Sequence, residues 1–328
     1  MRTRRQFLAV LGAGVTLTAP LPTLAQPAGM RRVGILVPAP RAGYEDRLEA
    51  LRGGLRDLGY VEGRHVTYEY RSSEGRYELF PTLVAELVAT KVDVIVTGGT
   101  PAALAAKKAT TTIPIVIGAI SDPVATGLVP SLARPGGNIT GLMFFVAELC
   151  AKRLEFLKQV LPRIKRVAAL MHPDNASMAP VQLEMAQAGG ALGVEVVRFD
   201  ARAPGEFEDV FSAMVARRAD AVVIVEDALF NVNAGRLGAL ATAKRLPSIG
   251  LDSVALGGGL LSYGVSQVDM FRRAAIYIDK IFKGARPADL PIERSSTFDL
   301  IVNLRTARQL GIAVAPEIRL RASQVIDP

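Results

Sequence analysis

Short apolar runs alternate with amphipathic stretches along most of this chain, and the alternation predicts the strands and helices of an α/β fold. The first apolar run covers residues 31–37, and leucines then recur at helical spacing through 48–58. An alternating strand is expected at 66–70 and a further helix at 77–89. Strands joined by helices in this order form a parallel sheet with right-handed crossovers.

The clearest unit of the pattern covers residues 92–123. A β-branched run turns through two glycines into an alanine-rich helix, for which Thr100 is the expected N-cap. A second buried strand at 113–117 is followed by a Ser-Asp-Pro turn at 121–123. Because ligands bind at the carboxyl ends of strands in open α/β sheets, we expect these turns to form one wall of a binding site.

A second series of the same kind begins after a Gly-Gly-Asn break at 136–138. It starts with a helix at 147–161, and its strands are expected at 166–171, 195–199, 221–225 and 248–251. A long helix at 267–282 lies far along the chain from the core of this second sheet, so we expect it to return to the first one.

The two series predict an α/β fold of two doubly wound parallel-sheet lobes joined by a multi-strand hinge. We expect residues 31–140 and about 266–292 to form the N-terminal lobe, and residues 141–265 to form the C-terminal lobe. Residues 293–328 should supply a closing strand, a helix and a tail, which the pattern does not assign to either lobe.

The first 25 residues have the layout of a cleavable signal peptide: a basic head, an apolar middle and a small-residue end. Arg4-Arg5, within TRRQFL, is similar to the twin-arginine export pattern; an ordinary Sec signal with two arginines is the alternative. We therefore expect cleavage after Ala25 and a periplasmic protein that does not insert into the membrane. Because ATP and nicotinamide cofactors are not generally supplied in the periplasm, we expect no cofactor.

The charge and the single cysteine change this picture little. The formal net charge is +8, and positions 2, 4 and 5 of the predicted leader carry three of these charges. No dense run of Lys and Arg follows, which argues against nucleic-acid binding. Cys150 is the only cysteine, so an internal disulfide is excluded, and we expect it to be a half-buried structural thiol. A nucleophilic role would need a nearby histidine, and the chain has only His65 and His172.

Several motifs together resemble those of a known family. They include Ile113-Pro114-Ile115-Val116, Ser121-Asp122-Pro123, the run from Leu132 to Gly141 that contains Arg-Pro-Gly-Gly-Asn, and Leu290-Pro291-Ile292-Glu293. The chain resembles the ABC-transporter substrate-binding proteins that adopt the type I periplasmic-binding fold. The resemblance covers nearly all of the chain after the leader. It implies two lobes that close over a ligand held in the cleft between them, and some relatives carry aromatic amino acids.

Candidate ligand contacts in the first lobe follow its strands. The backbone after Gly99 and the hydroxyl of Thr100 would bind an anion such as a carboxylate, since the helix dipole favours negative charge there. Ser121 and Asp122 would bond an amine or a hydroxyl, and Tyr44 would stack on an apolar or aromatic part of the ligand. The alternatives are a tight turn at Gly98-Gly99 with Thr100 only capping the helix, helix initiation at Asp122, and a surface tyrosine for Tyr44.

The second lobe supplies the opposite wall. Its candidates are His172, Asn175 and Ser177 after one strand, Glu226 and Asp227 after another, Asp252 after a third, and Tyr263 near the second hinge crossing. Carboxylates here would complement an ammonium or hydroxyl group. The alternatives are a solvated helix turn at 226–227 and a turn-stabilising role for His172. No His, Cys, Asp or Glu cluster has metal-ligand spacing, so no metal is expected.

These observations favour a non-enzymatic solute-binding protein. It would capture an amino acid or another small carboxylate-bearing compound and deliver it, as a monomer, to an ABC permease with a cytoplasmic ATPase. One alternative is a periplasmic ligand-sensing subunit. Another is a cleft hydrolase in which Asp122 faces Glu226 or Asp227. Neither a P-loop lysine nor a Gly-x-Ser-x-Gly elbow is present to support an enzyme.

Overall fold

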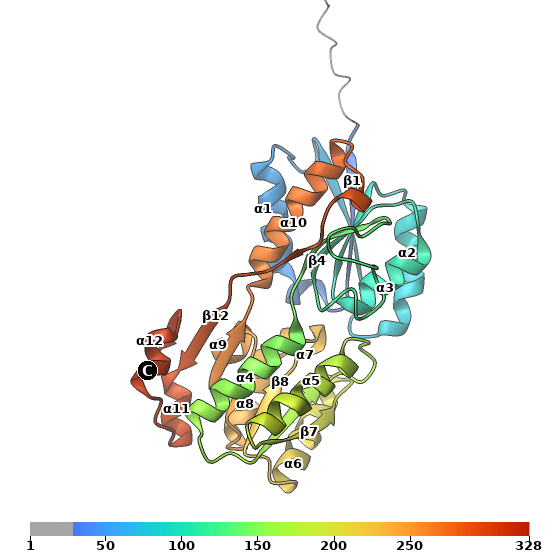
Figure 1. Ribbon diagram of the computed structural model, residues 1–328. Coiled ribbons are helices and arrows are strands. Elements are labelled where there is room, and N and C mark those ends of the chain that lie inside the picture. The colour runs from blue at the N-terminus through green and yellow to red at the C-terminus, as the bar shows by residue number, and fades with distance from the viewer. Residues whose placement is uncertain (1–28, 328) are drawn as a thin grey trace, which may run out of the picture.

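The computed structural model describes residues 29–327 and contains two mainly parallel α/β sheets, each covered by helices to form a lobe (Figure 1). This architecture confirms the predicted fold class. The predicted signal peptide at 1–25 lies outside the described residues. Within residues 29–327, no helix has the length and apolar character needed to cross a bilayer.

The first lobe is built on a six-stranded sheet of order β11-β5-β4-β3-β1-β2, in which the paired strands run parallel. Its strands are β1 (Arg31–Val37), β2 (Val66–Ser72), β3 (Val94–Gly98), β4 (Ile115–Ile120), β5 (Ile139–Met143) and β11 (Glu293–Arg294). β3 and β4 are buried along their whole length, as expected for central strands covered on both faces.

Helices cover both faces of this first sheet. The side chains of α2 (Phe80–Ala89) and α3 (Thr100–Ala109) pack with Ile95 and Ile117 in one core. On the opposite face, α1 (Glu45–Asp57) packs against α10 (Gln267–Phe282), so the late helix lies in the first lobe. Gly54 permits the close approach of α1 to α10, because a Cβ there would lie 2.5 Å from the carbonyl oxygen of Arg272.

The second lobe is built on a seven-stranded sheet of order β13-β12-β10-β9-β8-β6-β7. Its strands are β6 (Arg166–Met171), β7 (Glu195–Asp200), β8 (Ala221–Ile224), β9 (Ser248–Gly250), β10 (Leu261–Gly264), β12 (Asp299–Asn303) and β13 (Gln324–Ile326). The β10–β12 pair is antiparallel and the other pairs are parallel.

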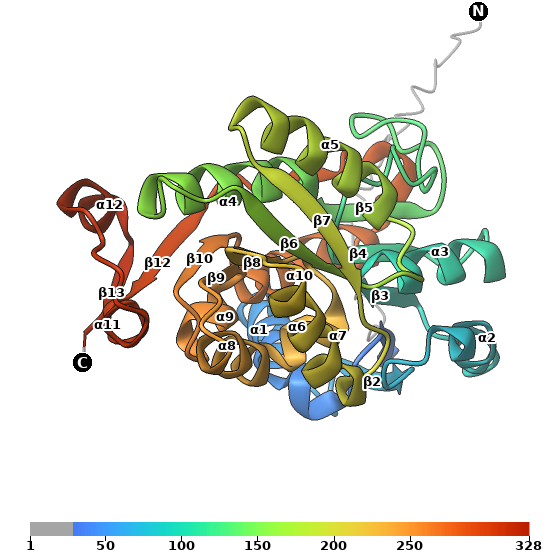
Figure 2. The ribbon, with the colours of Figure 1, turned by 90° about the horizontal axis from the view of Figure 1, so that it is seen from below.

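Figure 2 shows α4 (Val146–Val160) and α5 (Met178–Ala191) on one side of this second sheet, and α6 (Phe207–Ala216) and α8 (Ala234–Ala243) on the other. The short helices α9 (Asp252–Leu256), α11 (Leu304–Leu310) and α12 (Pro316–Arg321) complete the lobe. Short 3-10 turns lie at Arg41–Gly43, Tyr77–Leu79, Pro204–Glu206 and Pro287–Asp289.

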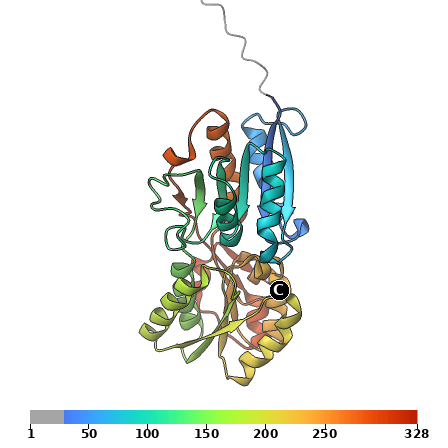
Figure 3. The same cartoon turned by 90° about the vertical axis from the view of Figure 1, so that its right-hand side faces the viewer.

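The chain passes between the lobes three times: from β5 to α4, from β10 to α10, and from β11 to β12. The two lobes lie one above the other along these crossings (Figure 3). The sheets place β11 in the first lobe and β12 and β13 in the second. The lobe boundaries predicted from the sequence remain a proposal.

Two segments differ from the sequence prediction. The predicted turn at 226–233 contains a short helix, α7 (Ala228–Val232), because the side chain of Asp227 accepts a hydrogen bond from the Leu229 backbone N–H and caps it. The predicted polar tail contains the end of α12 and then β13, which extends the second sheet by pairing with β12.

Candidate functional site

A cavity of about 480 Å³, counted with the solvent at its mouth, lies between the two lobes. The first lobe lines it with the turns after β1, β3 and β4, and the second lobe with the turns after β6 and β8. Eight of the residues predicted from the sequence line this cavity: Tyr44, Gly99, Thr100, Ser121, Asn175, Ser177, Glu226 and Asp227. The carboxyl ends of parallel strands from both sheets therefore meet at one place.

The N-terminus of α3 forms one end of the cavity. Gly99 takes a φ of 84° and turns the chain from β3 into the helix, so the N-cap is Gly99 and not Thr100 as predicted. The first N–H groups of a helix have no acceptor within it. Because Pro101 has no N–H, Thr100 and Ala102 supply the donors of this turn. With the Ser121 hydroxyl nearby, this end of the cavity suits a carboxylate.

Asp227 of the second lobe also lines the cavity, and its carboxylate is held by neutral donors. The Tyr77 hydroxyl donates to its Oδ1 and Oδ2 at 2.9 and 2.8 Å, and Asn175 Nδ2 donates to Oδ2 at 2.8 Å. The Leu229 N–H donates to Oδ1 at 2.9 Å. Asp227 is only 4% exposed, and it has no cationic partner among residues 29–327. A buried carboxylate without a cation attracts an ammonium group.

Asn175 and Ser177 support this arrangement. The amide oxygen of Asn175 accepts from the Ser177 backbone N–H at 3.1 Å and from its hydroxyl at 2.8 Å. These bonds leave Asn175 Nδ2 directed at Asp227. Both side chains are buried, so we infer that they fix the orientation of the carboxylate.

Tyr77, which sequence reasoning missed, connects the lobes. It precedes α2 in the first lobe, yet its ring stacks on His172 of the second lobe with centroids 4.6 Å apart. Burial, together with the nearby Asp227 carboxylate, raises the pKa of Tyr77 far above its usual value, so the hydroxyl remains a donor. An aromatic residue in the loop after β2 was the only signal in the sequence.

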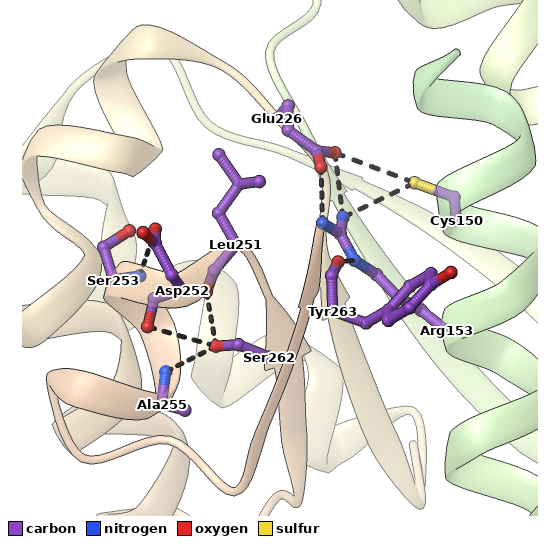
Figure 4. A network of polar contacts seen from close by, with 9 residues as sticks. All are labelled: Cys150, Arg153, Glu226, Leu251, Asp252, Ser253, Ala255, Ser262 and Tyr263. Atoms are coloured by element: carbon purple, nitrogen blue, oxygen red, sulfur yellow. Dashed lines mark hydrogen bonds and ion pairs between the residues drawn. The ribbon is translucent and has the colours of Figure 1, made fainter. Parts of the chain in front are cut away.

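Glu226 lines the cavity but is already paired. Arg153 of α4 binds it with both terminal nitrogens: Nη1 donates to Oε2 at 2.8 Å, and Nη2 donates to Oε1 (Figure 4). Nε of Arg153 donates to the carbonyl oxygen of Tyr263 at 2.8 Å. Cys150 Sγ lies 3.9 Å from Nη1 and is fully buried, not half-buried as predicted. Burial raises the pKa of the Cys150 thiol above its usual range, so it stays protonated.

Four predicted residues lie outside the cavity lining. Asp122 Oδ1 accepts from the backbone N–H groups of the two residues after Pro123, at 2.8 and 3.1 Å. His172 is buried behind Tyr77. Burial raises the pKa of the Asp252 carboxyl, which accepts from the Ser253 N–H. The Tyr263 ring packs against Phe156 and Phe298.

Apolar side chains complete the lining. Tyr44, Phe144 and Phe271 line the cavity, and the Tyr44 ring meets Phe271 edge-on at 6.1 Å. Burial raises the pKa of Tyr44 to about 12. These rings make this part of the wall suitable for an apolar or aromatic group. Residues 29–327 contain no cluster of His, Cys, Asp and Glu that could hold a metal ion.

Known proteins are similar to this chain in sequence and fold. A family model described as ABC transporter substrate binding protein matches residues 32–326. The tyrosine-binding protein of Clostridioides difficile is 24% identical over 79% of this chain and 74% of its own length.

Solved structures agree with this match. An ABC domain from Streptococcus pneumonia in complex with L-Trp is 26% identical, with a TM-score of 0.83, over 90% of this chain and 100% of the other. A conserved domain protein from Vibrio cholerae is 25% identical, with a TM-score of 0.85, over 90% of this chain and 99% of the other. The fold also matches that of type I periplasmic binding proteins of lower identity.

Proposed function

Because this chain belongs to the ABC transporter substrate-binding protein family, which is non-enzymatic, we propose that it captures a zwitterionic amino acid between its lobes and delivers it to an ABC permease. Asp227 is the observation that carries the proposal. Its buried carboxylate has neutral hydrogen-bond donors but no cation among the described residues. The α-ammonium group of an amino acid would supply the missing positive charge.

The rest of the cavity fits the remaining parts of such a ligand. The α-carboxylate would lie at the N-terminus of α3, where the N–H groups of Thr100 and Ala102 and the hydroxyl of Ser121 provide donors. The rings of Tyr44 and Phe271 would contact an apolar or aromatic side chain. The names of two relatives, one tyrosine-binding and one solved with L-Trp, support an aromatic amino acid as the first ligand to test.

Transport would follow from closure of the lobes. Ligand entering the open form would bridge α3 of the first lobe and Asp227 of the second, and closure would bury it. The closed form would then dock on the permease. We also propose that the protein works in the periplasm after removal of the leader behind Ala25, with the twin-arginine pair directing export. Asp122 lies outside the cavity, so the carboxylate pair of the hydrolase alternative does not form there.

The protein should be tested by thermal shift and by calorimetry with L-tryptophan, L-tyrosine, L-phenylalanine, L-leucine and L-glutamate. A true ligand should raise the melting temperature, because it binds only the native state. Asp227→Asn should reduce its affinity at least about 30-fold, since an ammonium group would lose its charged partner. Asp122→Asn, outside the cavity, is the matched control and should bind like the wild type. Turnover of the ligand, or unchanged affinity in Asp227→Asn, would contradict the proposal.

A further inference from the structure

We propose that Arg153 restricts the cavity to ligands with a single ammonium group, and so excludes diamines and amino acids with cationic side chains. The inference rests on the proposed binding of an amino acid and deepens it. Arg153 does not line the cavity and would not touch the ligand. It is a positioning residue that acts through Glu226.

The charges around the cavity carry the first step. Among residues 29–327, Glu226 and Asp227 are the charged side chains that line it, and they are neighbours in the sequence. If both were free, the cavity would present two carboxylates and would favour a ligand with two positive groups. The two carboxylates have different partners: Asp227 accepts from neutral donors, whereas Glu226 is bound by the guanidinium of Arg153.

The geometry of the pair carries the second step. Both terminal nitrogens of Arg153 bind the two carboxylate oxygens of Glu226 in a fork (Figure 4). The guanidinium is held from its third nitrogen by the Tyr263 carbonyl, and the Cys150 thiol lies against it. Arg153 is 0% exposed, so water cannot replace it and the charge of Glu226 stays compensated.

Selectivity follows from this compensation. Asp227 remains the one uncompensated charge among the described residues that line the cavity, and a single ammonium group neutralises it. A second ammonium group would lose its hydration without gaining an ion pair, because Glu226 is already bonded to Arg153. The guanidinium behind Glu226 would also repel it. A hydrophobic lining alone would not separate ligands with one and two ammonium groups in this way, because adding or removing a methylene group changes affinity only modestly.

The test compares two aromatic amino acids that differ by an aminomethyl group, and adds an aliphatic amino acid with two ammonium groups. Calorimetry would use L-phenylalanine, 4-(aminomethyl)-L-phenylalanine and L-lysine. In the wild type, L-phenylalanine should bind at least about 100-fold more tightly than either probe with two ammonium groups. Arg153→Met leaves Glu226 without its cation, so this ratio should fall by about tenfold or more. A merely structural role would weaken all three ligands together and leave the ratio unchanged.

A double variant is the matched control. Arg153→Met/Glu226→Leu replaces the whole pair by apolar groups, an exchange that buried ion pairs often tolerate. Asp227 is then again the one charge, and the ratio should return to within about threefold of the wild-type value. Equal ratios in the wild type, the single variant and the double variant would overturn the inference.

Glu226→Gln tests the inference if Arg153→Met does not fold. This variant leaves the guanidinium uncompensated, so L-phenylalanine should bind about tenfold more weakly relative to 3-phenylpropionate, which has no ammonium group. An unchanged ratio of these two ligands would overturn the inference. A wild-type protein that binds none of the ammonium compounds would overturn the proposed function and the inference with it. Wild-type binding of probes with one and with two ammonium groups at equal affinity would overturn the inference alone.

Discussion

At the scale of single residues, Tyr77 makes two kinds of contact with the second lobe. Its hydroxyl reaches Asp227 across the interface between the lobes, and its ring stacks on His172 in the same lobe as Asp227. The hydroxyl cannot ionise in the ordinary pH range, because burial raises its pKa far above the usual value. Tyr77 therefore donates a hydrogen bond from one lobe to the other, and in the proposed closure this bond would form only when the lobes meet.

Tyr77→Phe tests this hydrogen bond by removing only the hydroxyl. The closed form should lose a hydrogen bond to a charged group, so ligand affinity should fall about tenfold in calorimetry. The control is Tyr60→Phe, because the Tyr60 hydroxyl donates to Asp279 at 3.0 Å within the first lobe. That variant should lower the melting temperature without a change in affinity. If both variants bind ligand equally well, Tyr77 has no part in closure.

Residues in the turns that follow strands could be placed from the sequence, whereas residues that reach the site from other elements could not. Gly99, Thr100 and Ser121 follow strands, and the rule that ligands bind at strand ends locates them. That rule also selected Asp122 and Asp252, which bond to nearby backbone N–H groups. Arg153 and Tyr77 had no such signal, because their partners lie 73 and 150 residues away.

At the scale of elements, the contact of α1 with α10 holds the first lobe together. Two glycines of α1 face the late helix in different ways. A Cβ on Gly54 would lie 2.5 Å from the backbone oxygen of Arg272 and 2.9 Å from Cβ of Ala275. A Cβ on Gly53 would lie 3.2 Å from the flexible end of the Arg272 side chain, which can move aside.

These two positions give a matched pair of variants. Gly54→Ala should lower the free energy of unfolding by about 1–3 kcal/mol, since the helices must separate to admit a methyl group against backbone. Gly53→Ala should leave it unchanged or raise it by up to about 1 kcal/mol, through helix propensity alone. Urea denaturation followed by circular dichroism measures both. Equal stability of the two variants would show that α10 tolerates displacement.

The elements themselves were largely predictable, because buried strands and amphipathic helices have distinct periods. Position along the chain also indicated that α10 returns to the first lobe. α7 and β13 were missed for physical reasons. α7 spans only Ala228–Val232 and depends on the Asp227 cap, and β13 spans Gln324–Ile326 and exists through its pairing with β12. Both are too short for a periodic pattern to be visible.

At the scale of the whole molecule, Gly43 of the first lobe lies against Val232 of the second. A Cβ on Gly43 would lie 2.5 Å from Cγ1 of Val232. Because the two residues belong to different lobes, we propose that this contact forms when the lobes close. The two residues thus mark a point at which opening and closing can be altered from outside the cavity.

Gly43→Ala should therefore shift the population toward the open form. Small-angle scattering should report a larger radius of gyration in the presence of ligand, and affinity should fall about tenfold, the equivalent of a 1.4 kcal/mol shift. Adding Val232→Ala should recover part of the affinity, because it removes the methyl groups that the new Cβ meets. A Gly43→Ala protein as compact and as tightly binding as the wild type would exclude this contact from closure.

Because the chain crosses between the lobes three times, each lobe is completed by segments that are synthesised late. The hydroxyl of Tyr60 donates to Asp279, which is synthesised 219 residues later. The packing partner of α1, helix α10, is likewise synthesised late in the chain. In a nascent chain, the apolar face of the first lobe that α10 covers therefore stays exposed while most of the second lobe is synthesised. That second lobe is itself incomplete until β12 and β13 have left the ribosome. The first lobe lacks α10 and β11, and the second lacks β12 and β13, until the residues from 267 onward have been synthesised.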